Sequence, residues 1–353
     1  MTGTDREGLM RLLSSLPIPG AGEELILRPD GDVPLAMWRS QGQPPRAFVL
    51  DGEGHKELLP GDDPDLPAAK RFGKKSRMIR TLEPFLGEVR EPQLVAWRPG
   101  KRAVVRVLRG DTAVFVKFLD KKTYRRAAKA IAALPDAVPP MEFARASHWI
   151  DSECAYVADS AKGVCLRDIL SRRETPPWDL LDRSIRALGA SPVHDEMPVI
   201  DFGTARDAGV RMLRKGAVLL PELAERAERL ARIAPPSCVR TGLVHGDFHD
   251  RQIFFTPDRA SLIDLETVGR GDCTFDLVNM AEQLRLRALQ QTANDDGTGS
   301  ALLDRHDVDA DARVRWGVAV RARLCGVYAL RPKWAGLTQR LMREVDDLLT
   351  QTA

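Results

Sequence analysis

The stretch Leu243-Val-His-Gly-Asp-Phe-His-Asp-Arg-Gln-Ile-Phe-Phe255 determines how the rest of the chain is interpreted. It opens with an apolar pair, passes through a polar turn and ends in an apolar run that is typical of the start of a strand. The turn contains two histidines, two aspartates and a glutamine: His245, Asp247, His249, Asp250 and Gln252. A short loop needs less polar chemistry than this for its own folding, so we expect a functional loop.

A second acidic segment, Ser261-Leu-Ile-Asp-Leu-Glu266, places Asp264 seventeen residues after Asp247. It is again a β-type run, and it ends in Asp264 and Glu266. A strand that brings one carboxylate next to another is costly unless a cation lies between them. The spacing therefore predicts a divalent metal site, with Asp247 free to hold a reacting hydroxyl.

The composition is that of an ordinary globular protein of 353 residues, 43% hydrophobic and 29% charged. This length predicts about two domains. The net charge of +3 is too small to argue for nucleic acid, and no apolar run approaches the roughly 20 residues of a membrane span. The five cysteines form no CxxC pair, and the N-terminus shows no signal-peptide core. We expect a reduced, cytoplasmic protein without nucleic-acid or membrane partners.

Residues 1–90 predict a small β-rich cap. The segment Pro29-Asp-Gly-Asp32 is typical of a hairpin turn between two strands. The run Lys70-Arg-Phe-Gly-Lys-Lys-Ser-Arg77 is basic and is typical of a solvated helix or loop face. The alternative is a patch that binds an anion or a partner.

Residues 91–160 predict a second β-rich unit with a helix. The expected strands are 93–97, 103–108, 112–118, 143–150 and 153–158, with a helix over 121–134. Lys117 lies within an apolar strand, where a charge needs a reason. It is either an outward-facing lysine of an edge strand or a lysine directed at a phosphate.

Residues 161–353 predict a mainly helical unit that follows the polar joint Ser160-Ala-Lys-Gly163. We expect a loop over 292–300. Asp201-Phe-Gly203 matches a protein-kinase metal motif, but it precedes the 243–255 loop, which is the wrong order for that motif, so we expect it to be a turn. The expected helices are 207–220, 221–233, 275–289, 308–330 and 333–352.

Together these segments resemble the aminoglycoside phosphotransferase and choline kinase group, which shares the protein-kinase-like fold. The resemblance rests on His245-Gly-Asp247 with Gln252, on Ile263-Asp-Leu-Glu266 and on Lys117, and it runs from about Gln93 to the C-terminus. It implies an α+β, bilobal protein, with a β-rich N-lobe over 91–160 and a mainly helical C-lobe over 161–353. The extension 1–90 lies outside it. ATP and Mg²⁺ are the implied cofactors.

The resemblance also implies roles for single residues. Asp247 resembles the catalytic-loop aspartate that orients the acceptor hydroxyl and takes its proton. Asp264 resembles the metal-chelating aspartate, and Gln252 stands where the family usually has Asn. Lys117 resembles the lysine that pairs the α- and β-phosphates. A basic turn replaces the glycine-rich phosphate loop and supplies Arg98, Gly100, Lys101 and Arg102.

Two features depart from the family pattern. The helix after Lys117 contains no glutamate to hold the lysine, and Asp120 or Glu142 would have to substitute. Gln252 is one methylene longer than Asn, which changes the geometry at the metal.

Asp276 resembles an acid that braces the catalytic loop, and a helix N-terminal charge is the alternative.

The sequence therefore predicts a phosphotransferase that acts on a hydroxyl of a small molecule, such as an antibiotic, sugar or amino alcohol, or of a peptide Ser or Thr. The alternative is a kinase-fold protein that binds a ligand or partner without turnover. A metal hydrolase, with a cluster at His245, Asp247, His249 and Asp250, is the third interpretation. It needs further histidines, and the chain offers only His55, His148, His194 and His306, in no paired spacing. The basic stretches at 70–77 and 121–129 suit an anionic or acidic partner.

Overall fold

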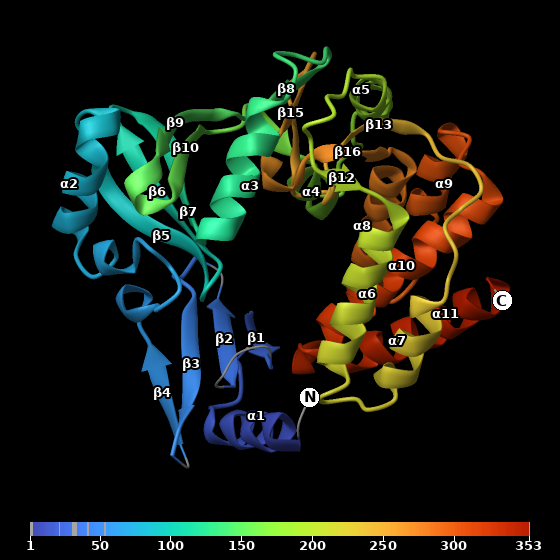
Figure 1. Cartoon of the computed structure of the whole chain (residues 1–353), viewed down its shortest axis with the longest axis horizontal. Coiled ribbons are helices and arrows are strands. Elements are labelled where there is room, and N and C mark those ends of the chain that lie inside the picture. The colour runs from blue at the N-terminus through green and yellow to red at the C-terminus, as the bar shows by residue number, and fades with distance from the viewer. Residues whose placement is uncertain (1–2, 21, 30–33, 41, 53, 353) are drawn as a thin grey trace. The chain divides into compact units, whose positions relative to one another are not determined.

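The computed structural model describes residues 3–352 except 21, 30–33, 41 and 53. The chain divides into two compact units (Figure 1). The first comprises Met1–Arg126, Arg145–Ser160 and Leu330–Lys333, and the second comprises Ala127–Ala144, Ala161–Ala329 and Trp334–Ala353. This division places strand-rich segments in the first unit and most helices in the second, which confirms the α+β, kinase-like class.

The N-terminal part of the first unit is an antiparallel sheet with a helix against it. The sheet order is β1-β2-β3-β4, and its neighbour α1 buries Leu9 and Leu12. Its elements are α1 (Gly3–Ser15), β1 (Glu23–Arg28), β2 (Leu35–Ser40), β3 (Arg46–Asp51) and β4 (Gly54–Leu58). The helix was not predicted, and most of the predicted hairpin turn at 29–32 lies outside the described residues.

A five-stranded antiparallel sheet forms the rest of the first unit, in the order β5-β6-β7-β10-β9. Its strands are β5 (Arg90–Arg98), β6 (Arg102–Arg109), β7 (Thr112–Leu119), β9 (Ala146–Ile150) and β10 (Ala155–Asp159). Alternate residues of β6 and β7 face a core shared with α2 (Lys75–Leu86), a second helix that was not predicted. The same core includes Ala47 of β3 and Leu66, so residues 1–90 pack into it. The boundary at residue 90 stays a prediction.

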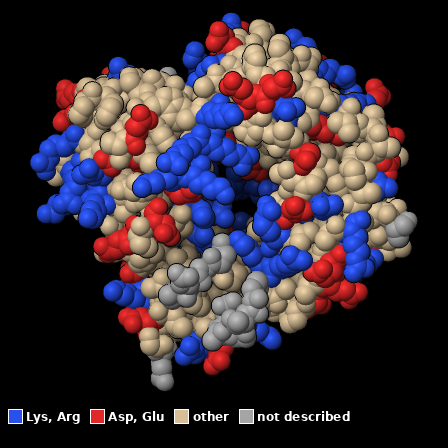
Figure 2. All heavy atoms as spheres, in the orientation of Figure 1, with Lys and Arg blue, Asp and Glu red and all other residues tan. Residues whose placement is uncertain are grey.

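The helix α3 (Lys121–Ala132) follows β7 as predicted and is strongly two-sided. Its Tyr124, Ala127, Ala130 and Ile131 are buried. Five basic residues occupy the exposed face, and the helix has no acid: Lys121, Lys122, Arg125, Arg126 and Lys129. Figure 2 shows Lys and Arg side chains gathered over this helix.

The second unit is organised around α10 (Ala310–Ala329), which packs against α6, α8 and α11. Gly326 permits the contact with α6, because a Cβ there would lie 2.3 Å from the Met212 backbone. The other helices are α4 (Leu166–Ser171), α5 (Trp178–Gly189), α6 (Phe202–Gly216), α7 (Leu223–Ala231), α8 (Thr274–Thr292), α9 (Thr298–Arg305) and α11 (Ala335–Gln351). In the described residues, no helix combines the length and apolar character that a membrane crossing requires.

Two small sheets in the second unit carry the 243–266 region. Their orders are β11-β14-β15-β8 and β12-β16-β13. Their strands are β8 (Met141–Phe143), β11 (Val164–Cys165), β12 (Val199–Ile200), β13 (Thr241–Val244), β14 (Ile253–Phe255), β15 (Ala260–Leu262) and β16 (Gly269–Asp272).

Three local predictions were wrong. The strand predicted over 143–150 is two strands, because β8 pairs with β15 in the second unit while β9 joins the five-stranded sheet. The loop predicted over 292–300 ends early, since α9 begins at Thr298. Asp201-Phe-Gly203 is the start of α6, where the Asp201 carboxylate caps the helix by accepting from the Thr204 N–H at 2.7 Å.

Candidate active site

The loop between β13 and β14 is held by a buried carboxylate. Asp276, in the first turn of α8, accepts hydrogen bonds from the backbone N–H groups of His245 at 2.6 Å and Gly246 at 3.0 Å. Burial raises the pKa of Asp276 to about 6, although these two donors favour its charged form. Asp276 therefore braces the loop from a helix N-terminus, which combines the two roles weighed for it.

The side chain of His245 fixes the same turn from the other side. Its Nδ1 accepts from the Asp247 N–H at 3.3 Å, so its Nε2 carries the proton that it donates to Ile263 O at 2.8 Å. Gly246 has a φ of +82°, and a Cβ there would lie 2.6 Å from Thr267 O. Only glycine fits at this position, so the sequence His-Gly-Asp sets the direction in which Asp247 leaves the backbone.

A β-hairpin brings Gln252 and Asp264 together. Strands β14 and β15 pair Ile253 with Leu262, and Ile263 N–H donates to Gln252 O at 2.9 Å, so Gln252 lies beside the two residues that follow β15. Gln252 Nε2 donates to Asp264 Oδ2 at 3.1 Å, and Asp264 adopts a left-handed conformation with a φ of +60°. The predicted metal ligands are therefore adjacent, although Asp264 lies twelve positions after Gln252 in the sequence.

The Gln252–Asp264 pair has the spacing of two ligands on one Mg²⁺ ion. Octahedral Mg²⁺ holds oxygen at about 2.1 Å, which puts neighbouring ligand oxygens about 3 Å apart. A half-turn of the Gln252 amide would place Oε1 where Nε2 now lies. Gln252 and Asp264 would supply only two of the oxygen ligands that an octahedral ion requires. Such an ion would need further oxygens from a ligand such as a triphosphate.

Asp247 is accessible and has a basic neighbour that sequence reasoning missed. Its side chain is 37% exposed, and Oδ1 accepts from Arg323 Nη1 of α10 at 3.3 Å. Arg323 Nη2 also donates to Asn279 Oδ1 at 2.7 Å, and Asn279 Nδ2 donates to Phe248 O at 2.7 Å. The one sequence signal was Asn279, a polar residue in the apolar part of α8.

His249 lies between Asp247 and Gln252. Its Nε2 lies 3.8 Å from Asp247 Oδ2 and 3.2 Å from Gln252 Nε2. Asp247, Gln252 and Asp264 thus form one continuous set of contacts within the second unit. In that set one carboxylate is open to an acceptor, while a carboxylate and an amide are placed to hold a cation.

Lys117 lies in the first unit, at the centre of the five-stranded sheet. Its neighbours are Val104 of β6 and Tyr156 of β10, and its Nζ lies 5.6 Å from the Tyr156 ring centroid. The residue is only 8% exposed. The alternative of an outward-facing lysine on an edge strand is therefore wrong.

The two acids considered as substitutes for the missing helix glutamate have other partners. Asp120 caps α3, because Oδ1 accepts from the N–H groups of Lys122 at 3.1 Å and Thr123 at 3.0 Å. Glu142 pairs with Arg259 in the second unit. The family's lysine–glutamate pair is therefore not rebuilt from either acid.

The basic turn Arg98–Arg102 is held by the N-terminal extension. Buried Asp63 accepts from the Gly100 N–H at 2.9 Å and from Trp97 Nε1 at 2.9 Å, while Arg28 Nη1 donates to Pro99 O at 2.7 Å. The backbone donor of Gly100 is thus already bonded. Any phosphate contact of this turn falls to the side chains of Arg98, Lys101 and Arg102.

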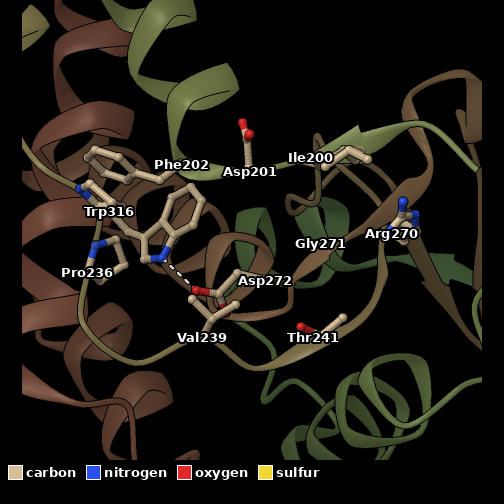
Figure 3. Close-up of a pocket in the computed structure, with 12 residues that line it drawn as sticks. Ile200, Asp201, Phe202, Pro236, Val239, Thr241, Arg270, Gly271, Asp272 and Trp316 are labelled. Carbon is tan, nitrogen blue, oxygen red and sulfur yellow. Dashed lines mark hydrogen bonds between the residues drawn. The ribbon is translucent and has the colours of Figure 1, made fainter. Parts of the chain in front are cut away.

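A pocket of about 250 Å³ lies elsewhere in the second unit (Figure 3). Phe202, Trp316 and Val239 line its apolar wall. Its two carboxylates are used locally: Asp201 caps α6, and Asp272 accepts from Trp316 Nε1 at 3.1 Å. The lining includes none of the predicted site residues.

Comparison with known proteins identifies the family. A model of the phosphotransferase enzyme family matches residues 119–316, more than half of the chain. The chain belongs to this phosphotransferase family. The match contains Asp247, Gln252 and Asp264, and it confirms both the predicted family and the predicted enzyme class. A search of curated protein sequences gives no match to this phosphotransferase.

Solved structures share the fold of this phosphotransferase at low sequence identity. A thermostable mutant of the aminoglycoside phosphotransferase APH(4)-Ia has a TM-score of 0.53 at 11% identity, covering 78% of this chain and 99% of its own. The choline kinase LicA from Streptococcus pneumoniae has a TM-score of 0.52 at 11% identity, with the same coverages. A further mutant of APH(4)-Ia was solved with ADP and hygromycin B, and has a TM-score of 0.50 at 13% identity, covering 78% and 98%.

Replacing Asp63 should destabilise this phosphotransferase. Asp63→Ala leaves the Trp97 indole and Gly100 N–H groups without their acceptor, which we expect to cost about 2–4 kcal/mol in the free energy of unfolding. Denaturant unfolding measures the loss, with the exposed neighbour Asp62→Ala as the control. Equal stabilities of the two variants would contradict the role given to Asp63.

The buried carboxylate predicts a pH dependence of stability. The folded-state pKa of Asp276 is raised above its ordinary value, so its ionised form costs stability above about pH 6 and the cost vanishes below about pH 4. As the pH rises from about 4 to above about 6, the free energy of unfolding of the wild type, relative to that of Asp276→Asn, should therefore fall by up to about 3 kcal/mol. Denaturant unfolding at a series of pH values measures the difference, and a constant difference would argue against this assignment.

Proposed function

We propose that the chain is an ATP- and Mg²⁺-dependent kinase that transfers the γ-phosphoryl group to a hydroxyl of a small molecule or of a peptide Ser or Thr. The contact that carries the proposal is the 3.1 Å hydrogen bond between Gln252 and Asp264 on the loop that presents Asp247. Membership of the phosphotransferase family supports the reaction class. The solved relative with ADP and hygromycin B supports a nucleotide as donor and an alcohol as acceptor.

In this proposal Asp247 acts on the acceptor. Its exposed carboxylate accepts a hydrogen bond from the acceptor hydroxyl and directs the oxygen lone pair at the γ-phosphorus. As the new O–P bond forms, the bond from the γ-phosphorus to the bridging oxygen breaks, and its electron pair leaves with ADP. The hydroxyl proton passes to Asp247. Arg323 holds Oδ1 of Asp247 and so fixes the orientation of the base.

Gln252 and Asp264 would hold Mg²⁺ through Oε1 and Oδ2. When bound, the ion neutralises the charge that develops on the phosphate oxygens. We propose Lys117 as the partner of the α- and β-phosphates, because a lysine in the central strand of a sheet is fixed in direction. The side chains of Arg98, Lys101 and Arg102 are the proposed further phosphate contacts.

The rival is a kinase-fold protein that binds its ligand without turnover. The helix α3 carries no glutamate, and Asp120 is occupied in capping that helix. A lysine without the usual glutamate would be positioned less strictly, which favours binding over catalysis. A titration with MgATP, combined with an assay of phosphoryl transfer, separates the two functions.

A melting-temperature titration with MgATP tests the proposal. At about 100 times its dissociation constant the nucleotide should stabilise the wild type by roughly 2.7 kcal/mol. Asp247→Asn should keep this shift and lose phosphoryl transfer about 100-fold or more, because only the base is removed. Asp264→Ala should lose the part of the shift that depends on Mg²⁺.

The fully exposed Asp195→Asn is the matched control and should retain both the shift and the transfer. Absence of any MgATP shift in the wild type would contradict the kinase. A normal shift without transfer to any hydroxyl acceptor would favour the rival.

A further inference from the structure

Three arginines from three elements converge beside the catalytic loop. Arg167 lies in the first turn of α4, Arg251 on the loop itself and Arg287 on α8. The Arg167 backbone N–H donates to Asp250 O at 2.9 Å, and Arg287 Nε donates to Asp250 Oδ2 at 2.9 Å. Residue 250 therefore ties α4 and α8 to the chain segment that carries Arg251. We call Arg167, Arg251 and Arg287 the arginine cluster.

The arginine cluster carries more positive than negative charge. Asp250 is fully buried and is already paired with Arg287, and the other nearby acid, Asp168, is exposed to solvent. Burial lowers the pKa of Arg167, and the nearby charge of Arg287 lowers this pKa by more than Asp250 raises it. Like charges held this close oppose folding, so the cluster is a cost that a bound anion would remove.

Part of the cluster lacks a protein partner. Arg167 Nη1 is buried and donates to no acceptor within the described residues, whereas Arg251 is exposed to solvent. Arg287 is different, because its Nη1 donates to Gln290 Oε1 at 2.6 Å. A guanidinium N–H that is buried without an acceptor is costly, and an oxyanion bound at Arg167 would satisfy it.

The position of the cluster distinguishes it from the metal-ligand pair. His249 Nε2 faces Asp247 and Gln252, whereas His249 Nδ1 accepts from the Arg251 N–H at 3.2 Å and lies 3.5 Å from Asp250 Oδ1. The imidazole ring thus separates the predicted cation side of the loop from the arginine side. An anion bound by the cluster would therefore lie on the Asp250 side of the His249 ring, with Asp247 on the other side.

We propose that Arg167, Arg251 and Arg287 bind an oxyanion, a carboxylate or a phosphate, that the acceptor carries in addition to the hydroxyl it presents to Asp247. The inference rests on the proposed kinase function and names its substrate class. Planar guanidinium groups match carboxylate and phosphate oxygens in pairs. A cationic acceptor would instead meet like charge at this position, so the cluster selects against amines and for acids.

Binding of inorganic phosphate and of succinate to the full chain tests the cluster. Each anion is titrated at constant ionic strength, with saturating Mg–AMP-PNP present, and the melting temperature is followed. The wild type should be stabilised by at least one of them, phosphate alone indicating a phosphate-bearing acceptor and succinate alone a carboxylate-bearing one. Arg167→Ala and Arg251→Ala should weaken the binding about tenfold or more, since each removes a charged hydrogen bond.

Matched variants keep the test decisive. Arg251→Lys retains the charge and should bind at an intermediate strength, and the exposed Arg211→Ala on α6 should bind like the wild type. No stabilisation of the wild type by either anion would overturn the inference. So would equal binding by the Arg251→Ala and Arg211→Ala variants, or a shift that Mg–AMP-PNP abolishes, because the anion would then occupy the nucleotide site.

A titration with Mg–AMP-PNP alone separates this inference from the kinase on which it rests. A shift with the nucleotide but none with either anion leaves the kinase in place and removes the arginine site. A cluster-dependent shift with an anion but none with the nucleotide removes the kinase, and with it the assignment of the anion to an acceptor.

Discussion

The active site depends on a buried carboxylate that binds the backbone of the loop before Asp247. Two N–H groups, those of His245 and Gly246, converge on Asp276, and the His245 side chain closes the turn through Ile263 O. This arrangement fixes the loop without any ligand. The adjacent β14–β15 hairpin then places Gln252 beside Asp264 by register alone. Position, rather than covalent chemistry, is what phosphoryl transfer requires of a protein.

Basic side chains are gathered on α3 and beside the 243–255 loop. All five charged residues of α3 are basic, and Arg323 and the arginine cluster lie beside the 243–255 loop. The number and the separate positions of these arginines favour a second anionic group in the reaction, which the acceptor would supply.

Residues within 1–90 have a structural role in the five-stranded sheet and its 98–102 turn. Asp63 and Arg28 hold the two sides of the 98–102 turn, and Leu66 and Ala47 enter the core behind the five-stranded sheet. A phosphate loop made of glycines presents backbone N–H groups. Here the Gly100 N–H donates to Asp63, so this backbone group is not available to a phosphate. The turn is instead a hairpin held by Asp63, and it presents basic side chains.

The local patterns of the sequence predicted the strands β5, β6 and β7 and the helix α3, because each depends on neighbours close in the chain. The structure brings Gln252 and Asp264 together, while the roles of Asp247, Gln252 and Asp264 stay predictions. The pattern could not predict contacts over long separations, such as Asp63 with Gly100 or Asp247 with Arg323. It also missed α1 and α2, whose start signals are weak: Lys74 stands at the N-cap of α2, and that helix contains Pro84. Lys117 was ambiguous because strand order, not sequence, decides whether a strand lies at an edge.

The binding of Mn²⁺ in the presence of ATP tests most directly whether Gln252 and Asp264 hold one ion. Electron paramagnetic resonance gives the Mn²⁺ dissociation constant for the wild type, Gln252→Ala, Asp264→Ala and the double variant. If both side chains bind the same ion, the losses should be non-additive by about 1 kcal/mol or more. Losses that add within about 0.5 kcal/mol, or an unchanged affinity in Asp264→Ala, would contradict a shared site.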